Sequence, residues 1–278
     1  MELFGRDRRD DGLLHITAPA AESLVIPSFT LFWIFQMKEY AEFIGDVSLV
    51  ETYYTKMKEI LNVFFDRQEN GLIPNFYGDK QYWSFYEWNP TLQGTICQEQ
   101  EKSFDLVLNA LVSWMSQCMI KMASMIGKHD DLMDYAMRAT SLNEKINQCF
   151  YCEEDGVYVH AIGTLNSSQL GNSLAILCGA AEGKRAELVC EKMVNEKYMI
   201  ETTLSMKAFR FDALLKVNPP KYTDYVLTEI DRDWGYMLDQ GATSFWETLD
   251  GAEAFTKAGS LCHGWSAIPI IYYHRLLD

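Results

Sequence analysis

Apolar residues recur at helical spacing through most of the chain. The first clear segment runs from Ile26 to Gly45; it opens after a Pro-Ser pair and closes at the glycine, as helices commonly do. Asp46 is placed to cap a second helical segment that extends to about Gln68, before Asn70-Gly71 ends it. We expect these two segments to form an antiparallel helix pair.

The region from Leu72 to Gln100 has no helical period. It is rich in Trp, Tyr, Asn, Pro and Gly, which predicts a long ordered loop, and long ordered loops usually have a function. Downstream, Glu154-Asp155-Gly156 between two short β-type runs predicts a small hairpin within 151–159. The helical period marks the remaining segments, at about 104–126, 130–149, 169–178, 185–195, 206–217, 222–231 and 264–276.

About nine or ten helices in consecutive hairpins, with almost no strand, exclude parallel α/β folds and leave a bundle, a solenoid or a closed toroid. No fixed-period repeat supports a solenoid. Long aromatic loops on every second connection favour the toroid, and no linker-like stretch divides the chain. The sequence therefore predicts a single all-α domain over residues 1–278, an incomplete (α/α)6 barrel of helical hairpins with a small β-hairpin.

Charge and composition narrow the possible partners. The net charge of −15 is spread along the 278 residues, which makes nucleic acid a poor partner. Seven Trp and fifteen Tyr suit a globular protein with a partly aromatic cavity. The N-terminus is not signal-like and no apolar run of membrane-spanning length is evident. We expect a cytoplasmic chain without a membrane partner, although a longer parent protein could be exported.

The seven cysteines are odd in number and their spacings do not suggest a disulfide framework. Cys149 and Cys152 have the spacing of a redox motif, but they lie at a helix end without a βαβ context. We expect reduced thiols, no metal site and no cofactor.

The densest group of polar and aromatic residues lies in two neighbouring segments, 231–248 and 260–266. Sugar sites combine carboxylates, which hold hydroxyls or transfer protons, with flat aromatic rings that stack on the C–H faces of a pyranose. Glu247 beside Trp246 fits that chemistry. The candidate site residues of these two segments are Trp234, Asp239, Trp246, Glu247 and His263.

The long loop adds two candidates, Glu87 and Trp88. Trp88 ranks first as a stacking platform because its loop has no helical face to bury, although any single Trp is as often core as ligand contact. Glu87 and Asp239 either bind sugar hydroxyls or anchor loops. His263 either binds a hydroxyl or is a hydrogen-bonded buried histidine. We expect Trp88, Trp234, Glu247 and His263 to meet at one concave mouth.

Five segments resemble, in the same order, segments of the bacterial α-L-rhamnosidases of glycoside hydrolase family 78. The resemblance spans nearly the whole chain and implies hydrolysis of terminal α-L-rhamnosyl groups with inversion, acting on rhamnose-containing oligosaccharides, polysaccharides or glycosides. It implies that Glu247 is the general base and that His263 binds a sugar hydroxyl. The segments are Ile26–Trp33, Phe85–Trp88, Thr203–Lys207, Gly241–Glu247 and Ser260–Ala267.

One expected feature of that family is missing. Its general acid lies upstream, in a segment of the type Asp-x-Pro-x-Arg-x-Glu, and no such segment occurs here. Asp7, Asp10 and Asp11 come at the corresponding place in order but lack the proline, so we do not assign the acid to them. We expect the barrel to be truncated on its N-terminal side and the general acid to lie outside residues 1–278.

Two other functions stay open. A non-catalytic carbohydrate-binding fragment would keep the aromatic mouth without turnover. Another toroid enzyme, such as a sugar epimerase, would need a second base opposite Glu247. The chain has only five histidines, which counts against an epimerase.

Overall fold

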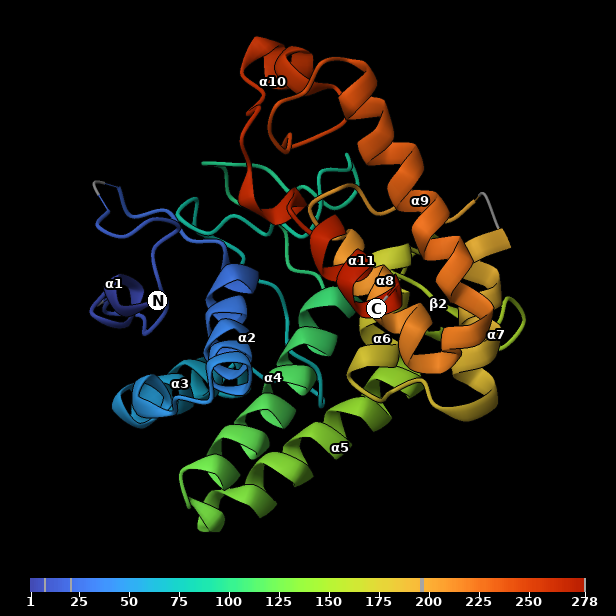
Figure 1. Cartoon of the computed structure of the whole chain (residues 1–278). Coiled ribbons are helices and arrows are strands. Elements are labelled where there is room, and N and C mark those ends of the chain that lie inside the picture. The colour runs from blue at the N-terminus through green and yellow to red at the C-terminus, as the bar shows by residue number, and fades with distance from the viewer. Residues whose placement is uncertain (8, 21, 196–197, 278) are drawn as a thin grey trace.

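The computed structural model describes residues 1–7, 9–20, 22–195 and 198–277. Helices dominate it, joined by loops, with one two-stranded antiparallel hairpin in which Tyr151 pairs with Tyr158 and Cys152 with Val157 (Figure 1). The elements are α1 (Glu2–Gly5), α2 (Pro27–Ile44), α3 (Ser48–Phe65), α4 (Leu106–Met125), α5 (Leu132–Phe150), β1 (Tyr151–Cys152), β2 (Val157–Tyr158), α6 (Gln169–Leu177), α7 (Gly183–Asn195), α8 (Lys207–Val217), α9 (Pro219–Asp239), α10 (Ala254–Lys257) and α11 (Pro269–Leu277).

Alternate helices form an inner layer. Helices α2, α4, α6 and α8 pack against one another in chain order, and α3, α5, α7 and α9 cover them from outside. The sequence explains this division: α4 and α6 are apolar on almost every face and are almost wholly buried, whereas α5 and α7 are apolar on one face only. Inner and outer helices in alternation are the arrangement of an (α/α)6 toroid, so the predicted fold is confirmed.

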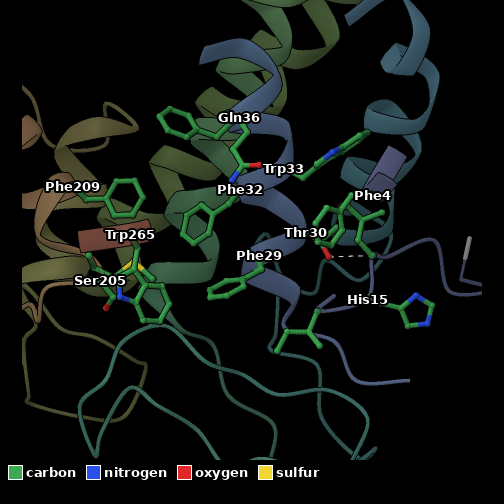
Figure 2. Close-up of a pocket in the computed structure, with 14 residues that line it drawn as sticks. Phe4, His15, Phe29, Thr30, Phe32, Trp33, Gln36, Ser205, Phe209 and Trp265 are labelled. Carbon is green, nitrogen blue, oxygen red and sulfur yellow. Dashed lines mark hydrogen bonds between the residues drawn. The ribbon is translucent and has the colours of Figure 1, made fainter. Parts of the chain in front are cut away.

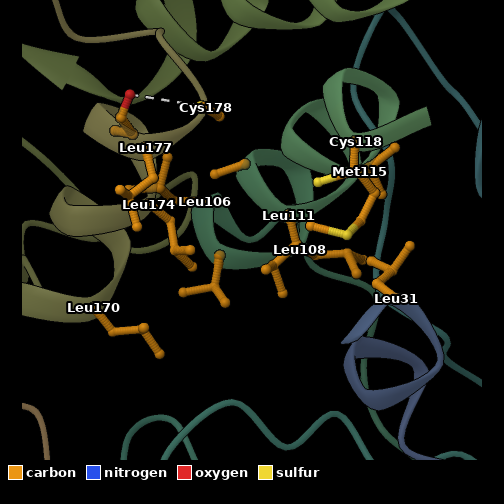
Figure 3. Packing of buried hydrophobic residues seen from close by; sticks show 14 of the residues in the cluster. Leu31, Leu106, Leu108, Leu111, Met115, Cys118, Leu170, Leu174, Leu177 and Cys178 are labelled. Atoms are coloured by element: carbon orange, nitrogen blue, oxygen red, sulfur yellow. Dashed lines mark hydrogen bonds between the residues drawn. The ribbon is translucent and has the colours of Figure 1, made fainter. Parts of the chain in front are cut away.

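The main core lies where the inner helices meet (Figure 3). Leu108, Leu111 and Met115 of α4 are almost completely buried, between Leu31 of α2 on one side and Leu174 of α6 on the other. A fully buried leucine contributes about 1.5–3 kcal/mol to stability, and the fold depends on many such contacts.

Helix α4 corrects one expectation from the sequence. It is long and apolar enough to cross a membrane by length and composition, yet 78% of its apolar window is buried inside the protein. Its apolar character is explained by its place at the centre of the inner layer.

Two asparagines of the inner helices bind the backbone of connecting segments: Asn109 binds the long loop and Asn172 binds the hairpin. Asn109 of α4 accepts a hydrogen bond from Ile73 N at 2.8 Å and donates one to Ile73 O at 2.9 Å. Asn172 of α6 makes the same pair with Tyr158 N and O, both at 2.9 Å. Because these backbone groups are buried, an apolar substitution would leave them without partners. The long loop and the hairpin are therefore attached to α4 and α6 at defined places.

The predicted element boundaries need two corrections. Helix α9 continues to Asp239, well beyond the predicted end near Asp231. The last helix begins at Pro269, after a short 3₁₀ turn at Gly264–Ser266, rather than at Gly264. The predicted hairpin and the long loop after Leu72 are confirmed.

Candidate functional site

Glu247 stands at the base of a loop. Its backbone N–H donates to Ser260 O at 2.8 Å, and its side-chain Oε2 accepts from Ser260 N at 3.3 Å. The chain between these two residues therefore leaves and returns at the same point. Because Ser260 binds both the backbone and the side chain of Glu247, the carboxylate has a defined position. The Glu247 side chain is 12% exposed.

His263 lies beside this carboxylate. Its Nδ1 is 3.7 Å from Glu247 Oε2, and its backbone N–H donates to Phe245 O at 2.7 Å. The imidazole is 32% exposed and packs against the Trp265 ring, with the ring centres 4.1 Å apart. Glu247 and His263 were predicted to lie together, and the structure confirms it. A carboxylate next to an imidazole offers a proton acceptor and a hydrogen-bonding group to one ligand.

Aromatic rings continue the site away from His263. Trp265 donates its indole N–H to Glu247 O at 3.3 Å, and its ring lies 6.4 Å from that of Trp88. Trp88 in turn lies 4.4 Å from Phe255, on the far part of the loop that begins at Glu247. Trp88 is partly exposed and thus has the position expected of a stacking platform. That it contacts a sugar stays a prediction.

Glu87 is fully buried beneath Trp88. Its Oε1 accepts hydrogen bonds from Trp88 N at 2.8 Å, from Ser205 Oγ at 2.7 Å and from Thr203 Oγ1, and its Oε2 accepts from Thr203 N at 3.1 Å. Burial raises the pKa of Glu87 above its ordinary value, and the hydrogen bonds only partly oppose this. This placement favours the loop-anchoring role over direct sugar binding: Glu87 joins the Trp88 loop to the segment that precedes α8.

The remaining candidates, Trp234, Trp246 and Asp239, form no hydrogen bond or ion pair with the carboxylate of Glu247 in the part of the chain that the structure describes. Trp234 is 6% exposed in a second apolar cluster and donates to Ser266 O at 2.8 Å. Trp246 is half-buried, and its carbonyl accepts from Ser266 Oγ. Asp239 is exposed at the end of α9. Trp234 therefore supports the site segment from the core, and the predicted sugar contacts of these residues remain untested.

An apolar cavity of about 360 Å³ lies next to this site, between α2 and α8 (Figure 2). Phe29 and Phe32 of α2 face Phe209 of α8, and Trp265 and Ser205 close one side. Phe32 and Phe209 stack with ring centres 5.5 Å apart. We call this space the inner cavity; Trp265 belongs both to it and to the Glu247–His263 group.

Sequence reasoning missed two of the aromatic residues that extend the site from His263, namely Trp265 and Phe255. Trp265 stood in a segment already singled out, two positions after His263, and that adjacency was its signal. Phe255 gave no such signal, because its importance comes from its contact with Trp88, 167 positions earlier in the chain.

Across residues 1–277, apart from the four that the structure leaves undescribed, no group of three or more His, Cys, Asp or Glu side chains is placed to hold a metal ion.

Comparisons with known proteins agree with this arrangement. A family model described as the bacterial alpha-L-rhamnosidase 6 hairpin glycosidase domain matches residues 1–277. The GH78 family rhamnosidase of Bacillus sp. GL1 superposes with a TM-score of 0.81 at 26% identity, over 95% of this chain and 28% of the Bacillus chain. No curated protein matches the chain.

Two further solved structures share the fold at lower identity. A rhamnosidase from Klebsiella oxytoca with rhamnose bound has a TM-score of 0.80 at 17% identity, over 98% of this chain and 52% of that chain. The GH63 mannosylglycerate hydrolase from Thermus thermophilus has a TM-score of 0.65 at 10% identity, over 98% of this chain and 87% of that chain. This chain thus spans less than a third of the Bacillus protein and about half of the Klebsiella one. Since the family model covers it almost from end to end, the chain belongs to the bacterial α-L-rhamnosidase family of six-hairpin glycosidase domains.

Proposed function

We propose that this chain is the base-carrying part of an inverting α-L-rhamnosidase that releases terminal α-L-rhamnosyl groups. The observation that carries the proposal is the position of the Glu247 carboxylate, held by Ser260 N at 3.3 Å and faced by His263 at 3.7 Å. In an inverting glycosidase, a carboxylate deprotonates the water that attacks the sugar from the face opposite the leaving group. Glu247 is the base in this proposal, and His263 binds a hydroxyl of the rhamnosyl unit.

The proposal places the general acid outside residues 1–278. A general acid must hold its proton near neutral pH, so its pKa has to be raised. Burial raises the pKa of Asp7, but hydrogen bonds from the backbone and ring of His15 outweigh it and lower the net value. Burial likewise raises the pKa of Asp11, but the Arg9 and Tyr82 hydrogen bonds outweigh it. Both aspartates are therefore poor acids.

The test uses two substrates that differ in their need for an acid. A 2,4-dinitrophenyl α-L-rhamnoside releases a stable anion, so we expect the chain to hydrolyse it. Replacing Glu247 by Gln should lower this turnover by about 10²–10⁴-fold while L-rhamnose binding persists, because positioned proton transfer contributes that much. The first sugar product, followed by NMR, should be β-L-rhamnose. An unchanged turnover or a first product of α configuration would refute the base assignment.

A natural rhamnosyl disaccharide, whose leaving group needs a proton, should be hydrolysed poorly or not at all. If the chain hydrolyses it as readily as the activated substrate, a carboxylate within residues 1–278 is the acid. Binding of L-rhamnose without turnover of either substrate would identify a carbohydrate-binding domain instead. Asp7→Asn serves as the matched control for Glu247→Gln, and it should leave turnover of the activated substrate unchanged.

A further inference from the structure

A polar cavity of about 240 Å³ lies between the long loop, the start of α4 and the segment that follows the hairpin. It shares no lining residue with the inner cavity. None of the described residues that line it is a lysine or an arginine. We call it the Asp105 cavity. Most of its lining side chains carry oxygen atoms, namely those of Asn75, Ser84, Tyr86, Thr91, Gln100, Ser103 and Asp105.

Asp105 supplies the one carboxylate among the described lining residues. Its Oδ2 accepts a hydrogen bond from the Tyr86 hydroxyl and its Oδ1 accepts one from Ser103 Oγ, both at 2.8 Å. Asp105 is the N-cap residue of α4, where an aspartate commonly accepts from a backbone N–H of the first helical turn, but its side chain makes no such bond. Two hydroxyl groups of the cavity wall hold this carboxylate instead of the helix end.

The hydrogen-bond partners of this carboxylate are neutral. Lys207, by contrast, forms ion pairs with the buried carboxylates of Glu229 and Asp233. Burial raises the pKa of Asp105, and the hydroxyl hydrogen bonds and the nearby His160 only partly oppose this. Charged groups inside proteins are normally paired or bind a metal ion. The Asp105 side chain therefore needs either a proton or a cation.

Further oxygen atoms approach the cavity from the long loop. Ser84 Oγ is buried and has no hydrogen-bond partner among the described residues. Gly94 has a φ of 59°, and a Cβ there would lie 2.6 Å from Ser84 O and 3.4 Å from Gln100 Oε1. Without a side chain at Gly94, these two oxygens approach the same stretch of the cavity wall. Carboxylate, carbonyl and other oxygen atoms are the ligands that hard cations prefer.

We propose that the Asp105 cavity binds one alkali-metal cation, sodium or potassium, coordinated by the Asp105 carboxylate, the Ser84 hydroxyl and water. One carboxylate balances one positive charge, whereas calcium sites usually draw on several carboxylates. The cavity has room for water molecules, at about 30 Å³ each, to complete the coordination. This inference does not depend on the proposed function, because none of the residues that it uses belongs to the Glu247–His263 group.

The bound cation fixes the loop that carries Glu87 and Trp88. Tyr86, whose hydroxyl binds Asp105, directly precedes Glu87, and its backbone N–H donates to Leu92 O at 2.9 Å. Leu92 also lines the cavity. A cation that holds Asp105 at the start of α4 therefore also holds the turn that contains Trp88. Occupancy of the site should raise the stability of the protein and slow amide exchange in this loop.

The test compares thermal unfolding of the whole chain in KCl, NaCl and tetramethylammonium chloride, each at about 0.1 M so that charge screening is equal. The large organic ion cannot be coordinated closely by oxygen atoms. At about pH 8, the melting temperature should be about 2–5 °C higher in at least one alkali salt, as expected for an ion at roughly ten times its Kd. Asp105→Asn should abolish this difference. Asp130→Asn, at an exposed aspartate, is the control and should keep it.

Ser84→Ala separates cation binding from a structural role. The substitution removes a hydroxyl that has no partner among the described residues, so the melting temperature in tetramethylammonium chloride should hold. The cation affinity, measured from the salt dependence of the melting temperature, should fall about threefold to tenfold because one ligand is lost. Hydrogen–deuterium exchange should slow in peptides from 82–105 when the alkali salt replaces tetramethylammonium chloride, and it should not change in α5.

Each other outcome decides against the site. If the three salts give the same melting temperature, no alkali cation binds. If Asp105→Asn keeps the gain in the alkali salt, the ion binds elsewhere. If about 1 mM CaCl₂ stabilises the protein through Asp105 and alkali salts do not, the cavity takes a divalent ion and the monovalent assignment is wrong. If alkali salts have no effect and acidification to about pH 5 stabilises the wild type but not Asp105→Asn, Asp105 carries a proton instead of a cation.

Discussion

Replacing Glu87 by glutamine tests how the Trp88 loop is held. The carboxylate accepts hydrogen bonds from two buried backbone N–H groups, of Trp88 and Thr203, through different oxygens. A glutamine side chain has one oxygen only, so its amide NH₂ must face one of those N–H groups. One unsatisfied buried donor costs about 1–3 kcal/mol, and we expect that loss of unfolding free energy. Glu87→Ala removes both acceptors and should cost about 2–6 kcal/mol.

The pH dependence of this loss has a defined sign. Burial raises the pKa of Glu87 in the folded protein, so the folded state holds the proton more tightly than the unfolded state does. Its contribution to stability is therefore complete below the unfolded pKa, about 4.3, and is lost as the pH rises through the folded pKa. Glutamine cannot titrate. The difference in unfolding free energy between the wild type and Glu87→Gln should accordingly narrow as the pH rises.

The assay is urea denaturation followed by tryptophan fluorescence at several pH values between about 5 and 8. Glu99→Gln, at an exposed glutamate of the same long loop, is the control and should stay within about 0.5 kcal/mol of the wild type. If the difference in unfolding free energy between the wild type and Glu87→Gln widens as the pH rises, the site prefers the ionised carboxylate. Our account of Glu87 as a buried group with a raised pKa would then be wrong.

Two further substitutions test the walls of the site. Gly259→Ala places a Cβ 2.0 Å from the carbonyl of Gly251 and should disrupt the loop, lowering both the melting temperature and L-rhamnose affinity; Gly264→Ala, with open space around it, is the control. Lys207→Met leaves two carboxylates of α9 buried without their ammonium partner and should cost about 3–5 kcal/mol in urea denaturation. Lys221→Met, at an exposed ion pair, should cost less than about 1 kcal/mol. If Lys207→Met and Lys221→Met lose the same unfolding free energy, burial does not make the Lys207 ion pairs more important.

The fold could be predicted because its main signals are local. The apolar period of α2 to α5 and the turn at Gly156 each lie within a short stretch of sequence, and the structure has these elements where the pattern placed them. The end of α9 was missed because residues 231–239 were interpreted as a site motif. Ile230, Trp234 and Met237 nevertheless keep helical spacing and are all buried, so the period was present. Pro269 likewise marked the start of the last helix, since proline favours the first helical turn.

The site was less predictable because its chemistry depends on contacts between distant segments. The chain has two glutamates that directly adjoin a tryptophan at a candidate site, Glu87 with Trp88 and Glu247 with Trp246, and the sequence offered the same reasons for both. The folded chain gives them different environments. Glu87 contacts Thr203 and Ser205, which are 116 and 118 positions away, and both donate hydrogen bonds to its buried carboxylate oxygens.

Glu247 instead bonds to Ser260, only 13 positions away, at the mouth of a loop, and stays partly exposed beside His263. A carboxylate can act as a base only where water and a sugar can reach it, and a carboxylate whose oxygens are all occupied by buried hydrogen bonds is not open to them. The environment of each glutamate thus depends on which segment the fold brings against it, and only that of Glu247 suits the base that we propose. The resemblance to the rhamnosidases separated Glu247 from Glu87 where residue type and neighbours could not, because it compares whole arrangements rather than pairs of adjacent residues.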